Sequence, residues 1–422
     1  MKKRLFFSLF LIPVLAAGLY VYKSYFARPY LTVMGYVRMA DGLGRQTAEL
    51  IAAFKEEMSI GFVPTHRTRK EDVPEGIWRI LKNRKRPLGK VILFEDCLFF
   101  PGHLPYQKFK TPAASDQIRI AYSMFESTEI PPEWTLILNT YFDAVVVPDP
   151  FLIPVYKKCG VQIPIFMIPL ALDLSGFLNR PLKERPNTPF TFANLSSCVD
   201  RKNQLTLLKA FARAFGNSEK VRLIIQARST FNKLERKIAQ EIEALGLTNV
   251  RFAVNPLTKE EYEKLFESID CYVNLSKGEG FSIQPREAMA LGIPAIVTDN
   301  TAQTTLCKSG LVTAVPAPYP ESAFYDWGRT YGFSFGCSVD EAADALKRVY
   351  DNYSAYLQQG KAARQWVRQY EYSALKPLYL SLIKPKKVLL GKENRITEEY
   401  LMTTSFELLK KYQKIARSSI HK

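Results

Sequence analysis

The chain has 422 residues, of which 47% are hydrophobic, and a formal net charge of +17. This length and apolar content exclude a globally disordered chain and allow two ordinary domains, each with its own core. The charge indicates an anionic partner, such as an acidic membrane surface, a nucleotide or a nucleic acid. We expect no nucleic acid, because the chain has no recognisable binding motif and no glycine-aromatic repeat.

Residues 1–28 predict a membrane anchor or signal segment. Basic residues follow Met1, and the uncharged run from Leu5 to Tyr22 is just long enough to span a bilayer. Small residues at 16–18 also fit a cleavable signal peptide, although the apolar run continues beyond them. We expect an uncleaved, single-pass anchor. Its topology stays open, because basic residues flank both sides almost equally.

Residues 29–178 predict a Rossmann-like α/β domain. Apolar runs typical of strands alternate with helical patterns, and these runs are LTVMGYV, VILFED, IRIAYSMF, FDAVVVP and PIFMIPLAL. After the first run, Gly42 and Gly44 lead into an amphipathic helix. A glycine loop at a helix start can admit a phosphate closely, although two glycines alone more often mark a turn.

A segment rich in proline and charge, residues 179–189, predicts a linker to a second Rossmann-like domain at 190–365. The alternation resumes there with FTFANL, VRLIIQA, VRFAV, CYVNLS, AIVT and GLVTAV. The predicted fold class is therefore α/β, with two doubly wound parallel sheets facing a cleft and an N-terminal membrane helix.

Two adjacent cations open the second domain. Arg201 and Lys202 follow the first strand of this domain, in a polar loop that leads into an amphipathic helix. Paired cations beside a cleft can neutralise a diphosphate as charge develops on it. They can also be a solvated basic pair, although the positive end of a helix dipole is slightly unfavourable for cations.

Residues 278–299, GEGFSIQPREAMALGIPAIVTD, combine two carboxylates with a glycine-containing turn before a helix. Pro285 suits the first helical position, which places Glu279 in the approach loop and Glu287 in the first turn. Helix N-termini and the carboxyl ends of parallel strands both favour anionic ligands, so the pattern predicts a nucleotide phosphate site. Two glutamates at a helix start can also serve only the dipole and solubility.

Residues 366–422 predict return helices and a basic tail. From Lys384 to Lys422, ten Lys or Arg outnumber four Glu and alternate with apolar residues. An amphipathic basic helix fits an anionic membrane surface, and a solvated terminal helix fits equally well.

The sequence predicts no metal site. Its three histidines, at positions 66, 103 and 421, are far apart, and its cysteines form no CxxC pair. The chain also lacks a D-x-D motif. We therefore expect neither a metal nor another cofactor.

The string at 278–299 closely resembles the donor-site signature of GT-B glycosyltransferases, in particular the retaining family 4 (glycosyl transferases group 1), approximately EGFGxxxxEAMAxGxPVIAxD. This resemblance implies that Glu287 binds the ribose hydroxyls of a sugar nucleotide. It also implies a catalytic-site role for Glu279, next to the transferred sugar. The sugar and phosphates would contact the amides of Gly280, Phe281, Ser282 and Ile283.

The start of the second domain resembles the family's GRLxxxKG segment and, more closely, a DRKN variant, which makes Lys202 the phosphate-binding lysine. Two positions depart from the family pattern. Asn194 stands about where many members carry arginine, and Ser282 replaces the usual second glycine. Arg201 can substitute for the charge missing at the first of these positions.

The first domain resembles the family more weakly. Gly42, Gly44 and Arg45 match in part the GGxGR loop that reaches the donor from across the cleft. Residues 121–134 resemble a segment of the type MFESTxxPxxW, in which Glu126 is our second candidate for a catalytic residue. A helix cap or an interdomain salt bridge is an equal alternative for this carboxylate. We identify no counterpart of the catalytic-site histidine that many relatives carry.

The resemblance implies transfer of a hexose-type sugar from a nucleotide diphosphate to a hydroxyl of a glycan or lipid-linked acceptor, in cell-surface polysaccharide or lipopolysaccharide assembly. The catalytic domains would face the compartment that contains the donor, which is the cytoplasm in a bacterium. Two other interpretations stay open. One is a membrane-tethered sugar-nucleotide-binding protein without transfer activity, suggested by Asn194 and Ser282, and the other is a basic nucleic-acid binder, suggested by charge alone.

Overall fold

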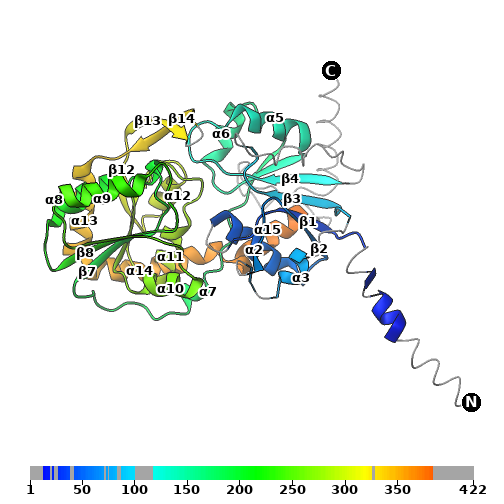
Figure 1. Ribbon diagram of the computed structural model, residues 1–422, viewed down its shortest axis with the longest axis horizontal. Coiled ribbons are helices and arrows are strands. Elements are labelled where there is room, and N and C mark those ends of the chain that lie inside the picture. Colours follow the sequence, from blue (N-terminus) through cyan, green and yellow to red (C-terminus); the bar gives the residue numbers. More distant parts are fainter. Residues whose placement is uncertain are drawn as a thin grey trace, which may run out of the picture.

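The computed structural model describes residues 13–19, 21–22, 27–38, 42–70, 73–74, 76–82, 87–99, 117–325 and 328–383. Their main body is two α/β lobes that lie side by side (Figure 1). Within the described segments, we find no helix whose length and apolar character would suffice to cross a bilayer. Residues 13–19 of the expected anchor are helical, whereas residues 1–12 and the basic tail, 384–422, lie outside the described residues.

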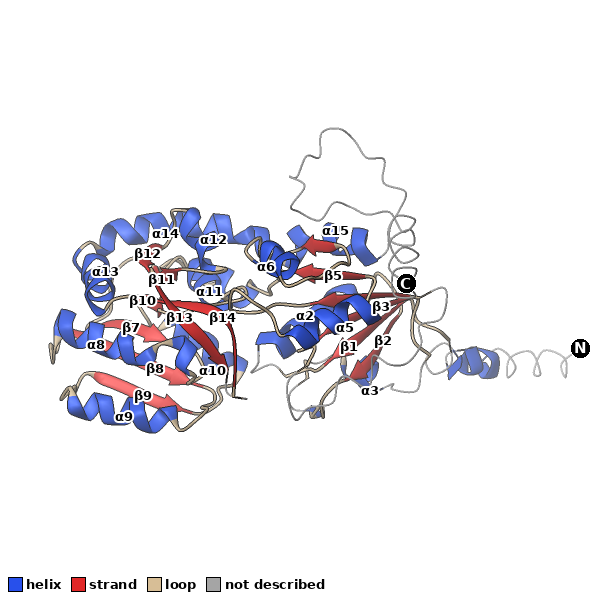
Figure 2. Ribbon diagram, turned by 90° about the horizontal axis from the view of Figure 1, so that it is seen from above, coloured by secondary structure: helices blue, strands red, loops and turns tan. Residues whose placement is uncertain are grey.

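The first lobe is built on a parallel sheet that has six strands in the described part of the chain, in the order β2-β1-β3-β4-β5-β6 (Figure 2). The strands are β1 (Leu31–Gly35), β2 (Ile60–Pro64), β3 (Val91–Glu95), β4 (Ile118–Tyr122), β5 (Ala144–Val147) and β6 (Ile165–Met167). The helices are α2 (Gly42–Phe54), α3 (Trp78–Lys82), α5 (Pro132–Tyr141), α6 (Leu152–Lys158) and α7 (Ser175–Leu178). The chain runs outward from β1 to β2 and then returns to β3, which makes the sheet doubly wound.

Alternation along the strands buries both faces of this sheet. Leu31 and Val33 of β1 lie in the core on the side of α2, whereas Met34 lies in the core on the side of α5 and α6. Successive side chains of a strand point to opposite faces, so these apolar runs suit a sheet that is covered by helices on both sides.

The second lobe contains, in the described residues, a six-stranded parallel sheet in the order β12-β11-β10-β7-β8-β9. Its strands are β7 (Phe190–Asn194), β8 (Val221–Ala227), β9 (Val250–Val254), β10 (Cys271–Asn274), β11 (Ala295–Asp299) and β12 (Thr313–Pro316). Its helical elements are η3 (Asp200–Lys202), α8 (Gln204–Phe215), α9 (Leu234–Ala244), α10 (Lys259–Glu267), α11 (Ile283–Leu291), α12 (Gln303–Lys308), α13 (Val339–Asp351) and α14 (Tyr353–Val367). An antiparallel hairpin of β13 (Tyr319–Tyr325) and β14 (Arg329–Gly336) lies between β12 and α13 in the chain.

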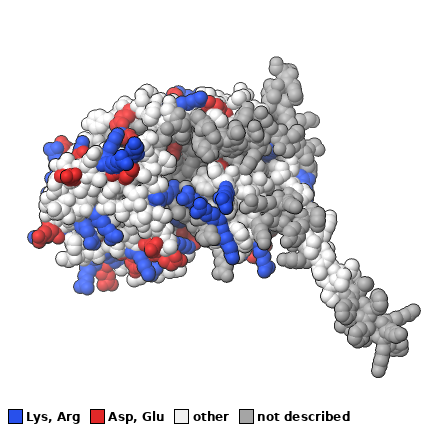
Figure 3. Space-filling model, viewed as in Figure 1, with Lys and Arg blue, Asp and Glu red and all other residues white. Residues whose placement is uncertain are grey.

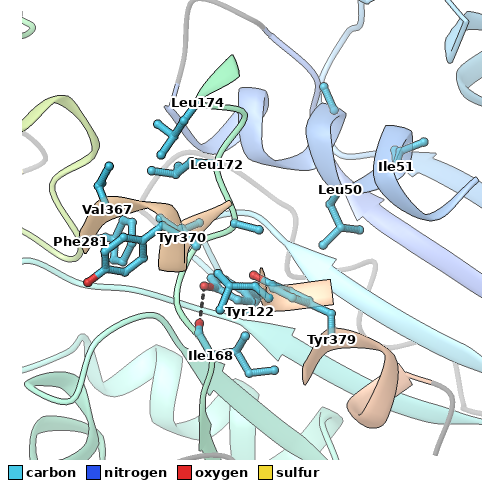
Figure 4. Packing of buried hydrophobic residues seen from close by; sticks show 14 of the residues in the cluster. Leu50, Ile51, Tyr122, Ile168, Leu172, Leu174, Phe281, Val367, Tyr370 and Tyr379 are labelled. Carbon is cyan, nitrogen blue, oxygen red and sulfur yellow. Dashed lines mark hydrogen bonds between the residues drawn. The ribbon is translucent and has the colours of Figure 1, made fainter. Parts of the chain in front are cut away.

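The end of the described chain returns to the first lobe. After η4 (Arg368–Tyr370), the helix α15 (Tyr372–Ile383) places Tyr379 against Tyr122 of β4, with ring centroids 6.2 Å apart. The Tyr379 hydroxyl donates to the carbonyl of Pro169 at 3.0 Å. Figure 4 shows these tyrosines beside Tyr370 and Phe281, so the first-lobe core continues across the junction into the second lobe.

A buried carboxyl ends β3. Glu95 is fully buried, and Gln46 on α2 donates a hydrogen bond of 3.5 Å to its Oε1. Burial raises the pKa of Glu95 to about 8, against a smaller lowering by a hydrogen bond from Thr47. This carboxyl is therefore largely protonated in the folded protein at neutral pH.

Stability should consequently fall as pH rises from about 4.5 to about 8, because of this group. The Glu95 contribution is fully present below the ordinary pKa of 4.5 and is lost as pH rises through 4.5 toward about 8. Glu95→Gln should remove the loss, which reaches roughly 1.4 kcal/mol per pH unit. Urea unfolding at several pH values between 5 and 9 measures it, with the exposed Glu56→Gln as the control. Equal pH dependence in wild type and Glu95→Gln would contradict the assignment.

Candidate functional site

The helix that carries the second glutamate begins earlier than predicted. The first residue of α11 is Ile283, two residues before Pro285, so Glu287 lies in the second turn and our placement in the first turn was wrong. The chain enters the helix through Ser282, whose φ is +69°. Pro285 is tolerated inside the first turn because N–H groups there have no intrahelical partner.

Glu279, Arg201 and Lys202 meet at the carboxyl edge of the second sheet. Lys202 forms an ion pair with Glu279 Oε1, and Arg201 Nη1 lies 3.3 Å from Glu279 Oε2. Arg201 also donates to the carbonyl of Gly278. Both cations come from η3, and the carboxylate comes from the loop between β10 and α11. The structure thus brings three of the predicted donor-site side chains together.

Glu126 joins this group from the other lobe. Its Oε1 lies 3.1 Å from Arg201 Nη2, which makes it an interdomain salt bridge, one of the two alternatives that the sequence left open. The two lobes are in direct contact here, because a Cβ on Gly278 would clash with the carbonyl oxygen of Glu126. A Cβ on Gly280 would likewise lie 3.1 Å from Met124 Cβ. These glycines therefore allow the loop to approach the first lobe. We call Glu126, Arg201, Lys202 and Glu279 the charged cluster.

Burial and mutual charge set the protonation of this cluster. Burial raises the pKa of Glu279, but the charges of Lys202 and Arg201 outweigh it and bring the pKa down to about 2. Burial lowers the pKa of Lys202, against the raising effect of Glu279. Burial also lowers the pKa of Arg201, but Glu126 and Glu279 raise it above its ordinary value. Glu279 is therefore a carboxylate at neutral pH, flanked by a permanent guanidinium cation.

Glu287 forms a second interdomain contact. Its carboxylate is fully buried, accepts from Arg45 Nη1 at 2.7 Å and accepts from the Tyr262 hydroxyl at 2.6 Å. Arg45 also donates to Glu49 Oε1 at 2.7 Å. Burial raises the pKa of Tyr272, and the charges of both Glu279 and Glu287 add to this effect.

We call residues 275–282, between β10 and α11, the donor loop. The predicted glycine loop lies against the start of α11, where the donor loop ends. Gly42 begins α2, and a Cβ there would lie 3.3 Å from Ile283 Cδ1 of the second lobe. Gly44 lies deeper in the first lobe, where a Cβ would lie 2.7 Å from the Arg38 backbone nitrogen. Gly42 therefore faces the other lobe, and Gly44 permits close packing within its own.

Arg286 is a contributor that the sequence did not reveal. It is fully buried, donates to the carbonyls of Phe281 and Ser282, and lies over the Phe281 ring at 3.7 Å and the Tyr370 ring at 4.5 Å. The arginine thus ties the donor loop to η4, where the chain crosses back to the first lobe. No sequence signal separates it from a surface arginine, because its partners are two carbonyls and a distant tyrosine.

The two departures from the family pattern have structural partners. Asn194 donates to the Val273 carbonyl at 2.8 Å and accepts from Ser196 at 2.6 Å, inside the second sheet. The Ser282 hydroxyl accepts from Asn274 at 3.1 Å and donates to Gln303 at 3.2 Å. These bonds hold Ser282 in the left-handed conformation, which disfavours most residues other than glycine.

A family model matches the part of the chain that carries most of this site. Residues 178–366 match the model described as glycosyl transferases group 1. This segment is therefore similar to group 1 glycosyltransferases. The matched segment contains Arg201, Lys202, Glu279 and Glu287, whereas Glu126 and Arg45 come from the lobe that precedes it.

Two curated relatives match a shorter stretch. Putative glycosyltransferases 41 and 45 of Sulfolobus islandicus filamentous virus are each 30% identical to this chain, over 135 and 145 residues. These matches cover 31% and 34% of this chain. The chain spans about a third of the length of these relatives, 35% and 37%.

Solved structures match both lobes. A glycosyltransferase from Rickettsia africae has a TM-score of 0.61 at 12% identity, over 85% of this chain and 98% of its own. HepE of Anabaena, crystallised with UDP and glucose, has a TM-score of 0.60 at 11% identity, over 84% of this chain and 99% of its own. Sucrose-phosphate synthase of Thermosynechococcus elongatus has a TM-score of 0.58 at 15% identity, over 84% of this chain and 100% of its own. The likeness confirms the predicted arrangement of two Rossmann-like domains in the GT-B manner.

Proposed function

We propose that the protein transfers a sugar from a nucleotide diphosphate sugar to a hydroxyl of a glycan or lipid-linked acceptor, with retention of the anomeric configuration. The observation that carries this proposal is the charged cluster, in which two cations and a carboxylate of the matched segment meet Glu126 of the other lobe. The UDP and glucose present in the HepE crystal support a donor of this chemistry. Basic side chains gathered along the boundary between the lobes also suit an anionic donor (Figure 3).

The cluster can perform the transfer without a protein nucleophile. Arg201 and Lys202 would stabilise the diphosphate as the bond from the sugar C1 to the phosphate oxygen breaks. The acceptor oxygen would bond to C1, and its proton would pass to the departing phosphate, which leaves a glycoside and a nucleoside diphosphate. Glu279 would position the sugar, and Glu287 would bind the ribose.

We extend the proposal to the setting. The apolar N-terminal run and the basic tail would hold the enzyme at an anionic membrane, with its domains on the side that contains the donor, in cell-surface polysaccharide or lipopolysaccharide assembly. We expect transfer to need no metal. In the described part of the chain, no group of three His, Cys, Asp or Glu residues is placed to hold a metal ion.

The test is donor binding and hydrolysis across UDP-, GDP-, ADP- and dTDP-sugars, with EDTA present. Selective binding of one donor with slow hydrolysis is the expected result. No binding to any donor by folded protein would overturn the proposal. Binding without turnover on any acceptor would favour the membrane-tethered sugar-nucleotide-binding protein, which the replacements at Asn194 and Ser282 suggest.

A further inference from the structure

The β13–β14 hairpin belongs to the second lobe by sequence but contacts the first (Figure 1). The Ser127 hydroxyl donates to the Tyr331 carbonyl at 2.8 Å. The Thr128 backbone nitrogen donates to the Phe333 carbonyl at 3.2 Å, and the Phe333 nitrogen donates to Thr128 Oγ1 at 2.9 Å. The edge of β14 therefore pairs with the residues that directly follow Glu126.

Aromatic packing fixes the same face of the hairpin. Phe125 stacks on Tyr325 with ring centroids 4.9 Å apart and meets Tyr331 edge-on at 6.0 Å. Tyr331 is only 7% exposed, whereas Phe324 and Phe333 on the opposite face are 66% and 50% exposed. Arg329, near the turn, forms an ion pair with Glu133 of α5. One face of the hairpin is thus docked on the first lobe.

The hairpin is also tied to the donor loop. The Phe335 nitrogen donates to the Lys277 carbonyl at 2.7 Å, and Lys277 Nζ lies 2.7 Å from Glu321 Oε2. Lys277 directly precedes Gly278, whose carbonyl accepts a hydrogen bond from Arg201. The hairpin therefore connects the donor loop of one lobe to the Glu126 segment of the other.

Tyr325 brings the hairpin to the charged cluster. Its ring stacks on Phe125, the residue that directly precedes Glu126. Burial raises the pKa of Tyr325 well above its ordinary value, and the charge of Glu126 adds to this effect. The hydroxyl therefore stays protonated and neutral at neutral pH.

We infer that the hairpin is a clasp that sets the position of Glu126 against Arg201, and that Tyr325 is the positioning residue through which it acts. The part of the site that Glu126 contributes from the first lobe is then complete only when a segment of the second lobe is docked beside it. The docking stands on the contacts alone, while its consequence for sugar transfer rests on the proposed function.

Two glycines of the hairpin allow a matched test of docking. Gly332 and Gly328 both have positive φ, +59° and +82°, so alanine strains the backbone at either position. A Cβ at Gly332 would lie 2.5 Å from Thr128 Oγ1 and 2.8 Å from the Glu129 nitrogen, whereas a Cβ at Gly328 has nothing within 4 Å. Gly332→Ala should therefore undock the hairpin, and Gly328→Ala should not.

Amide hydrogen exchange of the full chain measures the docking. We expect Gly332→Ala to speed exchange of the Thr128 amide at least about tenfold and Gly328→Ala to change it less than about twofold. Equal exchange in the two variants would overturn the clasp. This result does not depend on catalysis, so it stays informative even if the protein transfers no sugar.

The effect on chemistry is tested with the donor that the sugar-nucleotide panel selects. Tyr325→Phe keeps the ring on Phe125 but removes the hydroxyl, and it should lower kcat about tenfold with the donor KM within about twofold. In Tyr325→Phe, the Thr128 amide should exchange as slowly as in wild type. Tyr325→Leu should lose both the slow exchange of the Thr128 amide and the wild-type kcat. Phe324→Ala, on the exposed face, should change neither quantity. An unchanged kcat in Tyr325→Phe would contradict the positioning role of Tyr325. A change that appears only in the donor KM would contradict it as well.

Discussion

Replacing Lys202 with alanine is expected to lower kcat for sugar transfer about 10²- to 10³-fold, the usual cost of removing one group that stabilises developing charge. Lys202 pairs with Glu279 in a buried setting, where a cation acts more strongly on a diphosphate than it would in water. The fold should survive, because Arg201 still lies 3.3 Å from Glu279 and keeps this carboxylate paired.

The measurement is steady-state transfer or donor hydrolysis, with circular dichroism to verify folding. Lys209→Ala is the matched control. It also removes one lysine from the second lobe, but Lys209 lies on α8, where it is exposed and pairs with Glu241. Lys209→Ala should retain wild-type kcat. A loss of less than about fivefold in Lys202→Ala would place Lys202 outside the leaving-group site.

Replacing Glu287 with glutamine is expected to destabilise the protein by about 3 kcal/mol, because it leaves the Arg45 guanidinium without its buried partner. This figure is the lower end for buried pairs, since the Arg45 side chain is 16% exposed and keeps Glu49. The Tyr262 hydroxyl can still donate to the amide oxygen, so the loss reports mainly on the charge pair.

A double-mutant cycle with Arg45→Met separates stability from donor binding. The double variant should recover most of the stability in urea unfolding, because it replaces the pair rather than orphaning one member. Donor binding should stay lost, since the ribose would have no carboxylate to contact. Recovery of donor binding in the double variant would exclude Glu287 as the ribose ligand.

Most strands could be predicted, because parallel sheets buried on both faces have continuous apolar sequences such as VVV in β5 or LII in β8. Two features were missed. β2 has the short sequence IGFVP, in which glycine and proline weaken the strand pattern. The β13–β14 hairpin was missed because half of its aromatic residues face solvent, and its partner segment lies about 200 residues earlier in the chain.

The candidate site, like the fold, has residues that the sequence could predict and contacts that it could not. Glu279 and Lys202 could be proposed together because each lies in a recognisable motif of the second lobe. The partners of Glu287 could not be predicted, since Arg45 is separated from it by 242 residues and an arginine on an amphipathic helix usually faces solvent. Local sequence reports which groups a loop can present, and the packing of two lobes decides which of them meet.

The return of α15 to the first lobe has a consequence for biosynthesis. During translation, the chain needed for the second sheet is complete at Pro316, well before Tyr379 emerges to cover Tyr122 and Phe54. The lobe that is begun first is therefore finished last, contrary to the usual N-terminal-first order of folding domains. Until Tyr379 is made, Tyr122 of β4 and Phe54 of α2 lack the ring that packs against them in the finished lobe.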